Sequence, residues 1–298
     1  MASKDIIQKA SQELKPEKKQ QQGINAMMNA ILDGEGMRRR FEELLGQRTP
    51  QFLSSIVSLV NADVKLQKAF HESPMTVIQS ALKAATFDLP IEPSLGYAYI
   101  VPFDISYQDE NGDWKKRTEA VFIPGYKGLV QLCLRTGAYS RVPDAVDVRE
   151  GELVSYDRLT GDAEFKWEED EDKRETLPII GYAGYFRLKN GAEKTIYMTV
   201  KQIQAHEKKN RKGKYMTKGW RDDFDAMARK TIIRRLASKY GLMSIQNQNG
   251  DPDTVRMANE VMQGDFDDYP TPSPDGTIPA DFVDLDTGEV IEGVLADA

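Results

Sequence analysis

The sequence predicts an α+β fold with a helical N-terminal part, a small central antiparallel sheet with crossing helices, and a disordered acidic C-terminal tail. Apolar residues recur at helical spacing as far as Pro90, and from Tyr97 onward aromatic and β-branched runs alternate with turn-forming residues. Proline and acidic residues accumulate after residue 245. We therefore expect a mobile leader over 1–25, a single α+β domain over 26–245 and a flexible tail over 246–298.

The N-terminal helices are predicted by two Ser/Thr-Pro pairs. Proline is favoured at the first position of a helix because its fixed φ suits the helix and the N–H that it lacks would have no intrahelical partner there. Thr49-Pro50 is expected to cap and open a helix, since apolar residues follow at helical spacing. Ser73-Pro74 repeats this pattern, and the helix that it opens is expected to end before Pro90.

A β-hairpin and a third helix are predicted next. Tyr97–Phe103 and Ala120–Ile123 are rich in aromatic and β-branched residues, and turn-forming residues lie between them at Asp109–Asp113. Gly125–Gly137 has helical spacing and ends in a glycine C-cap.

Five further strands and two helices are predicted to complete the domain. The strands are expected near 142–149, 152–157, 163–167, 178–188 and 193–199, and the helices at about 199–210 and 220–240.

The composition excludes several kinds of site. A single cysteine, Cys133, cannot form an internal disulfide, and two histidines are too few to complete a Cys/His zinc site with it. No P-loop motif is present, and we expect no cofactor and no metal. No apolar run approaches the roughly 18 residues of a membrane span, and the first 25 residues contain no apolar signal-peptide core. We therefore expect a cytoplasmic protein without a membrane partner.

The net charge of −7 conceals two oppositely charged regions. Residues 246–298 contain thirteen acidic residues and one base, Arg256, and therefore carry −12. Residues 1–245 then carry +5. A basic body can bind a polyanion although the whole chain is acidic.

The densest basic region lies over 201–240, where thirteen Lys and Arg residues accompany four acids. Cations bind the phosphates of nucleic acid and aromatic rings stack on exposed bases, so this mixture predicts a surface for single strands. The alternative is a solvated basic helix with Trp220 in the core, in which Arg229 and Arg235 pair with acids or span a subunit contact. The candidate DNA-binding residues of this region are Arg211, Lys212, Lys214, Tyr215, Trp220, Arg221, Arg229, Lys230, Arg234 and Arg235.

Two other segments supply further candidates. Pro124–Gly128 resembles a phosphate-binding turn, because its glycines let a ligand approach the backbone and Tyr126 and Lys127 add a ring and a cation at a helix N-terminus. The alternative is a tight strand-to-helix connection with Tyr126 packed inward. Lys116 and Arg117, on the hairpin, would rim the same groove or simply keep the hairpin tip soluble.

A magnesium-dependent nuclease is an alternative from a different class of function. The acids available for it are Asp222–Asp225 and the run Glu168–Asp172. Adjacent residues on a helix do not share a face, and a run of five acids in a loop is typical of a solvated surface. We therefore expect no catalytic residues.

Four segments of the chain, in order, resemble the motifs of the RecT family of phage and prophage single-strand annealing recombinases. The segment Phe87–Phe103 is similar to the family's "LEP…LGxAYxxPF" signature, and Phe122–Gly128 followed by Arg135–Gly137 is similar to "GYrGmi…rsG". Val148–Glu152 resembles "VREGD", and Trp220 with Met227–Leu236 resembles "W…MAkKTaiRRL". The resemblance covers about 50–245.

The resemblance implies a protein that coats single-stranded DNA as a homo-oligomer, in a ring or a helical filament, and anneals it to a complementary strand without ATP. It also implies that annealed duplex DNA is bound, that a partner exonuclease resects the duplex ends, and that a host single-strand binding protein is a further partner. Tyr126, Lys127, Lys230, Arg234 and Arg235 occupy matching motif positions, and the resemblance extends a DNA-binding role to them. The alternative within the same class is a passive protein that coats single strands and does not anneal them.

Overall fold

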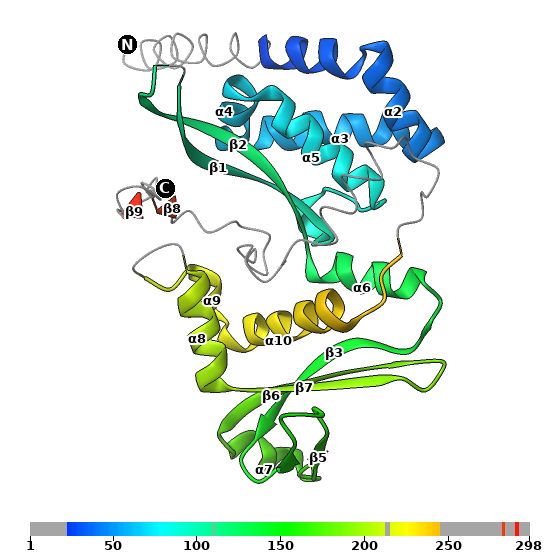
Figure 1. Ribbon diagram of the computed structural model, residues 1–298, viewed down its shortest axis with the longest axis vertical. Coiled ribbons are helices and arrows are strands. Elements are labelled where there is room, and N and C mark those ends of the chain that lie inside the picture. The colour runs from blue at the N-terminus through cyan, green and yellow to red at the C-terminus, as the bar shows by residue number, and fades with distance from the viewer. Residues whose placement is uncertain (1–22, 110, 212–214, 245–281, 284–289, 292–298) are drawn as a thin grey trace, which may run out of the picture.

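The computed structural model describes residues 23–109, 111–211, 215–244, 282–283 and 290–291. Its elements form two groups: Figure 1 shows N-terminal helices packed on a long hairpin at one end, and a three-stranded sheet with its own helices at the other. Each group has its own buried apolar cluster, and the two clusters meet at Met243. The architecture confirms the predicted α+β class with a helical N-terminal part and small antiparallel sheets.

The N-terminal group is helical. Residues 23–32 form a helix whose Ile24 and Met28 are buried, and the following elements are α2 (Glu35–Leu45), a 3₁₀ turn (Gly46–Arg48), α3 (Thr49–Ala62), α4 (Val64–Glu72) and α5 (Pro74–Thr86). Both predicted Pro-initiated helices are present. The expected cap at Thr49 is wrong: its hydroxyl donates to the carbonyls of Phe41 and Gly46, at 3.1 and 2.8 Å, and thereby ties α3 to the preceding helix.

The predicted hairpin is confirmed. Strand β1 (Ala98–Gln108) pairs antiparallel with β2 (Trp114–Pro124) along its whole length, from Ala98 opposite Pro124 to Gln108 opposite Trp114. Helix α5 lies against β2, where the Ser80 hydroxyl donates to the Ala120 carbonyl at 3.0 Å and the Ala120 N–H donates to the Thr76 hydroxyl at 3.0 Å. The helix thus satisfies backbone groups at one edge of a two-stranded ribbon that would be marginal by itself.

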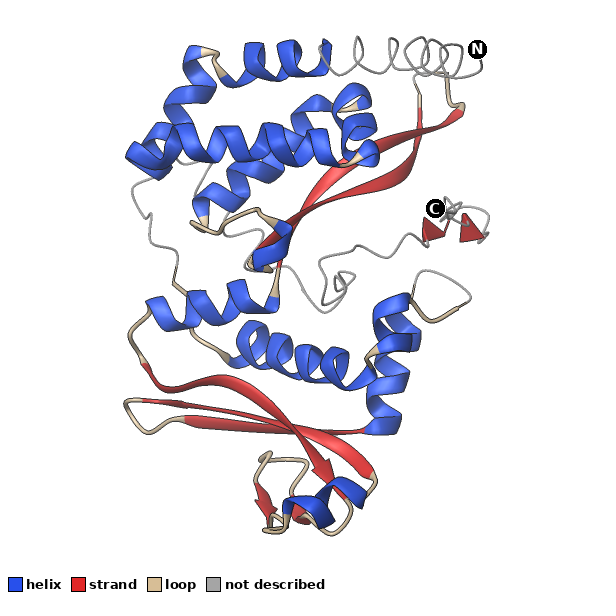
Figure 2. Cartoon of the chain, turned by 180° about the vertical axis from the view of Figure 1, so that it is seen from behind, coloured by secondary structure: helices blue, strands red, loops and turns tan. Residues whose placement is uncertain are grey.

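The second group is built on an antiparallel sheet with strand order β3 (Tyr139–Arg149), β6 (Ile179–Leu188) and β7 (Glu193–Thr199). One face is covered by α6 (Tyr126–Arg135), α8 (Val200–Asn210) and α10 (Phe224–Arg235), as Figure 2 shows from behind. Helix α10 lies very close to the sheet at Gly184, where a Cβ would stand 2.3 Å from Ile232 Cγ2.

The last long helix differs from its prediction over 220–240. It is divided into α9 (Lys218–Asp222), α10 and a π-helical turn (Leu236–Tyr240). Asp223 causes the first division, because its carboxylate accepts the Ala226 N–H at 2.9 Å and its own backbone is not helical, at φ −145° and ψ 76°. Aspartate competes in this way with helix continuation and instead begins a new helix as its N-cap.

The other face of the sheet carries a small unit formed by β4 (Leu153–Tyr156), β5 (Ala163–Phe165) and α7 (Glu171–Thr176). The prediction that the acids of 168–172 lie in a solvated loop is wrong in part, because Asp170 caps α7 by accepting the Lys173 N–H and Glu168 forms an ion pair with Lys173. These contacts of the acidic run with Lys173 stabilise the N-terminus of α7.

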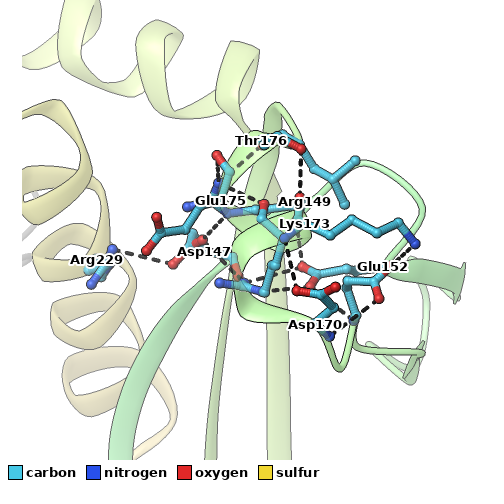
Figure 3. A network of polar contacts seen from close by, with 11 residues as sticks. Asp147, Arg149, Glu152, Asp170, Lys173, Glu175, Thr176 and Arg229 are labelled. Atoms are coloured by element: carbon cyan, nitrogen blue, oxygen red, sulfur yellow. Dashed lines mark hydrogen bonds and ion pairs between the residues drawn. The ribbon is translucent and has the colours of Figure 1, made fainter.

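Figure 3 shows the polar network that ties this unit to the sheet. The Arg149 guanidinium donates to the carbonyls of Arg174, Glu175 and Leu177. The Glu152 carboxylate is almost fully buried and receives the Arg174 guanidinium at 2.6 Å and the Arg149 backbone N–H at 2.7 Å. The segment Val148–Glu152, which resembles a motif of the family, therefore has a structural role. It holds the unit formed by β4, β5 and α7 on the sheet.

The buried Glu152 carboxylate predicts a large effect on stability. Burial by itself raises the pKa of Glu152, but hydrogen bonds from Arg174 and from the Arg149 and Glu168 N–H groups outweigh it and hold the pKa below the ordinary value of 4.5. The carboxylate therefore stabilises the fold above its unfolded-state pKa, and this stabilisation is lost as the pH falls through its lower folded-state pKa. Glu152→Gln is expected to cost about 3 kcal/mol at pH 7, since it breaks a buried ion pair and leaves the Arg174 guanidinium paired with Asp147.

Urea unfolding followed by circular dichroism at pH 7 and at lower pH checks this expectation. The matched control is Glu150→Gln, two residues away and exposed, which should unfold like the parent protein. Indistinguishable midpoints for the two variants would show that the network does not stabilise the fold.

Several predictions concern residues beyond the described part. Residues 1–22 of the leader predicted over 1–25 and most of the acidic tail lie outside it, whereas residues 23–25 of that leader begin the helix over 23–32. Within the tail the structure describes only β8 (Phe282–Val283) paired with β9 (Val290–Ile291). The assignment of 26–245 to a single domain stays a prediction. Among the described helices, none is long and apolar enough to cross a membrane.

Candidate nucleic-acid interface

Three of the four motif segments meet at one place in the fold, where the base of the hairpin, the start of α6 and the middle of α10 converge (Figure 1). The Gly125 N–H donates to the Tyr97 carbonyl at 2.9 Å, and the Arg234 guanidinium lies 3.4 Å from the Pro124 carbonyl. We call this place the motif junction and define it by Gly96, Tyr99, Gly125, Tyr126, Lys127, Gly128, Lys230 and Arg234.

The glycines of the junction serve close backbone packing. A Cβ on Gly125 would stand 2.1 Å from the Gly96 carbonyl oxygen, and one on Gly128 would stand 2.2 Å from the Tyr97 carbonyl oxygen. Gly96 itself has φ +73°, a conformation that favours glycine. The expectation that Gly125 and Gly128 open the backbone to a ligand is therefore corrected: they let the start of α6 lie directly on the 96–97 segment.

Two side chains at the start of α6 lie at the surface of the junction. Lys127 is exposed, and Tyr126, half-buried, has the Lys230 ammonium 5.9 Å from its ring centroid. Tyr126 also packs partly against the apolar cluster of the sheet group, so the alternative of a tight connection with Tyr126 packed inward is correct in part. The junction thus joins an accessible aromatic ring to two lysines, one from α6 and one from α10.

Two other side chains form the support beneath this surface. Arg234 is only 2% exposed, so it is placed under the junction and does not extend from it. Burial raises the pKa of the Tyr99 hydroxyl and neighbouring Tyr126 raises it further, while the Arg234 charge acts in the opposite direction. Lys230 and Arg234, both candidates for phosphate contacts, are therefore a half-buried lysine and a buried arginine behind it.

Arg229 and Arg235 leave α10 in different directions. The Arg229 guanidinium lies 3.3 Å from the Asp147 carboxylate, which confirms the alternative that this residue pairs with an acid. The same carboxylate also receives Arg149 and Arg174; burial alone would raise its pKa, and these three cations together with hydrogen bonding lower it. Arg235 contacts Met198 Sδ of β7 at 3.1 Å. Neither side chain belongs to the junction.

The remaining candidates of the 201–240 region are divided between surface and core. Arg211 forms a two-pronged pair with buried Glu207, and Trp220 is buried with its ring centroid 5.4 Å from that of Phe224. Tyr215 is 64% exposed, and the exposed Arg221 lies 3.4 Å from Asp222. The structure therefore places Tyr215 and Arg221 on the surface and Trp220 in the core; Lys212 and Lys214 lie outside the described residues.

The hairpin candidates lie far from the junction along β2. Lys116 and Arg117 are exposed, and the Arg117 guanidinium pairs with Glu119 and lies 4.7 Å from the centroid of the Tyr107 ring. Eight residues separate Arg117 from Gly125, which corresponds to roughly 26 Å of strand. These bases do not join the junction within one chain.

The acids weighed for a nuclease have structural partners. Asp223 caps α10, Asp225 accepts the Tyr182 hydroxyl, and Asp222 pairs with Arg221. In the part of the chain that the structure describes, no three His, Cys, Asp or Glu side chains gather as metal ligands would.

Residue-by-residue reasoning missed Tyr99 as a member of the junction. Its alternation with buried neighbours in β1 is typical of any strand, and only its place in the Leu95–Phe103 part of the family-like signature distinguishes it. The structure brings that signature against Gly125, where a Cβ would lie 3.1 Å from the Tyr99 ring.

Comparison with known proteins gives two matches. The model of the RecT family matches residues 50–269. The chain is also 44% identical over 229 residues to YqaK, an uncharacterized protein of Bacillus subtilis (strain 168), in an alignment that covers 77% of this chain and 72% of that protein.

Proposed function

Because this chain belongs to the RecT family, we propose that it binds single-stranded DNA at the motif junction and anneals it to a complementary strand. Phage-type single-strand annealing recombination is the activity that the family suggests. The finer statements are our proposal: binding through Tyr126, Lys127 and Lys230, annealing without ATP, and assembly into a homo-oligomer on DNA.

The observation that carries the proposal is the convergence of three motif segments on one accessible ring and two lysines. Annealing makes and breaks no covalent bond, so it needs phosphate neutralisation, base stacking and a way to present bases to a second strand. Lys127 and Lys230 supply positive charge, and Tyr126 supplies a face on which a base can stack. Tyr215 and Arg221, both exposed, extend the proposed contact surface on the α9 side.

The buried residues have a supporting role in this proposal. Arg234 places a positive charge behind Tyr99 and Tyr126 and holds the end of β2 against α10. Trp220 fixes α9 on Phe224. We propose that Lys116, Arg117, Arg229, Arg211, Lys212 and Lys214 act at a distance, as electrostatic attraction or as contacts with a neighbouring subunit. A partner exonuclease, a host single-strand binding protein and a cytoplasmic location belong to the same proposal.

The test is pairing of two complementary fluorophore-labelled oligonucleotides by the intact protein without ATP, run in parallel with Mg²⁺ and with a chelator. We expect faster pairing than for the oligonucleotides alone and no shortening of either strand. We also expect the logarithm of the affinity for single strands to fall linearly with the logarithm of the salt concentration, by about 0.7 for each neutralised phosphate.

Two results would contradict the proposal. Binding that protects the strands from pairing would establish a passive coating protein. Shortening of the DNA that stops in the chelator would establish a metal-dependent nuclease.

A further inference from the structure

A second basic surface lies on the side of α10 that contacts β7. There a hollow of about 490 Å³ opens between β7, α8 and the π-helical turn. We call it the basic hollow; the residues that matter for its chemistry are Tyr156, Tyr197, Lys209, Arg235, Lys239 and Tyr240.

Positive charge converges on the basic hollow from three elements. Lys209 comes from α8, Arg235 from the end of α10 and Lys239 from the π-helical turn. Among the twelve residues that line it, all of them described, none is Asp or Glu. A concave surface of one charge sign concentrates the field and attracts an anion.

Aromatic rings accompany the cations. Tyr240 is 49% exposed, and the Lys194 ammonium lies 5.4 Å from its ring centroid, which brings a fourth cation to the rim. Tyr156 and Tyr197 meet edge to face with ring centroids 5.6 Å apart. Alternating cations and rings suit a nucleotide chain, because the phosphates and the bases each find a partner. An acidic peptide would use only the cations.

The basic hollow is separate from the motif junction. Arg234 and Arg235 are consecutive residues of α10, yet Arg234 contacts Pro124 at the end of β2 and Arg235 contacts Met198 of β7. The body of α10 therefore lies between the two surfaces. The volume of the hollow falls within the roughly 300–1,000 Å³ typical of sites for small ligands, which is enough for a nucleotide-sized group.

We propose that the basic hollow is a second binding site for single-stranded nucleic acid, with phosphates on Lys209, Arg235 and Lys239 and a base against Tyr240. This inference rests on the proposed function and adds to it a contact on the opposite flank of α10. A protein with two such surfaces holds one strand at two points or holds parts of two strands at once.

Charge reversal tests the hollow against a matched control. Lys209→Glu/Lys239→Glu and the control Lys201→Glu/Lys208→Glu change the net charge equally, and the control lysines are exposed on α8 and do not line the hollow. Affinity for an oligothymidylate is measured by fluorescence anisotropy over a range of salt concentrations. Loss of two phosphate contacts is expected to lower the affinity roughly 60-fold at about 50 mM salt and to reduce the salt slope by about 1.4 relative to the control.

Photo-crosslinking of the intact protein gives a readout that does not depend on how a variant folds. An oligonucleotide carrying 5-bromouracil is irradiated on the protein, and the modified peptides are identified by mass spectrometry. We expect adducts on Tyr240, from the hollow, as well as on Tyr126, from the junction. Tyr126 adducts without Tyr240 adducts would overturn the second site and leave the proposed function standing.

Other outcomes are equally decisive. An equal effect of the two charge-reversal variants would overturn the second site. If Lys209→Glu/Lys239→Glu lost affinity for a polyglutamate peptide and kept its affinity for DNA, the hollow would be a site for an acidic protein segment and the inference would be wrong. Absence of DNA binding by the intact protein would overturn both proposals.

Discussion

Lys127→Glu/Lys230→Glu is expected to abolish annealing under conditions in which the parent protein completes annealing during the assay. The two lysines reach the junction from α6 and α10, and Lys230 lies 5.9 Å from the centroid of the Tyr126 ring. Two lost phosphate contacts correspond to roughly 60-fold in single-strand affinity at about 50 mM salt, and the new carboxylates add repulsion.

The control for this variant is Lys166→Glu/Lys189→Glu, which makes the same change in net charge at two exposed positions of the sheet group. Circular dichroism and the urea midpoint establish that both variants fold. Annealing that is equally fast in the two variants would place the DNA-binding surface elsewhere.

The ring of the junction is tested by a milder change. Tyr126→Leu keeps apolar packing at a half-buried position and removes the stacking face. Base–aromatic stacking contributes about 1–3 kcal/mol per base, so we expect the affinity to fall between roughly fivefold and 150-fold while the salt slope stays the same. If the salt slope of the affinity changed while fluorescence quenching by base stacking stayed the same, Tyr126 would act only by positioning Lys230.

Gly128→Ala is expected to destabilise the protein strongly, because the added methyl group would press on a backbone carbonyl. The new Cβ would stand 2.2 Å from the Tyr97 carbonyl oxygen, and the Leu89 side chain lies 3.0 Å away on another side. Neither α6 nor the 96–97 backbone can move without breaking the Gly125 N–H to Tyr97 hydrogen bond at 2.9 Å. We expect a loss of more than about 3 kcal/mol, at the upper end of overpacking effects, and a protein that fails to anneal because the junction is displaced.

The matched control is Gly36→Ala in α2, where a Cβ meets nothing within 4 Å. This change should stabilise the protein by up to about 1 kcal/mol, because alanine is the better helix former. Urea titration of the two variants beside the parent protein measures the difference. A Gly128→Ala protein as stable as the parent would refute the close-packing role of this glycine.

Local sequence signals were sufficient where one feature dominates. Proline at the start of α3 and α5 and the turn residues 109–113 between β1 and β2 each act within a few residues of chain, so the elements could be predicted without a tertiary context. The division of 220–240 at Asp223 also rests on a local signal, since aspartate is among the residues favoured at a helix N-cap.

Long-range contacts decided the roles of the charged residues. Arg229, Lys230, Arg234 and Arg235 are almost adjacent in the chain, and the structure gives them four environments: an ion pair with Asp147, the surface beside Tyr126, a buried place behind Pro124 and the basic hollow. A helix turns by about 100° per residue, so neighbouring side chains meet whatever element packs on their own side. Composition counts the cations equally and cannot distinguish these environments.

Gly241 illustrates the same division. It directly follows the π-helical turn, where a glycine is a usual stop signal, yet its φ of −79° needs no glycine. Glycine is required because a Cβ would stand 2.7 Å from the Ala237 carbonyl oxygen and 2.8 Å from the Tyr139 hydroxyl, which also accepts the Leu242 N–H at 2.6 Å. That contact joins residues about a hundred positions apart.

The sequence by itself determined the α+β class, the order of the elements, the charge difference between body and tail, and membership of the family, because these depend on composition and on patterns within short segments. Only the tertiary structure decided which cations lie on a surface, that the junction glycines serve close packing, and that the basic region has two separate faces. The physical reason is that burial and pairing depend on which distant segment packs against a side chain, and the sheet and the hairpin bring those segments together only in the folded chain.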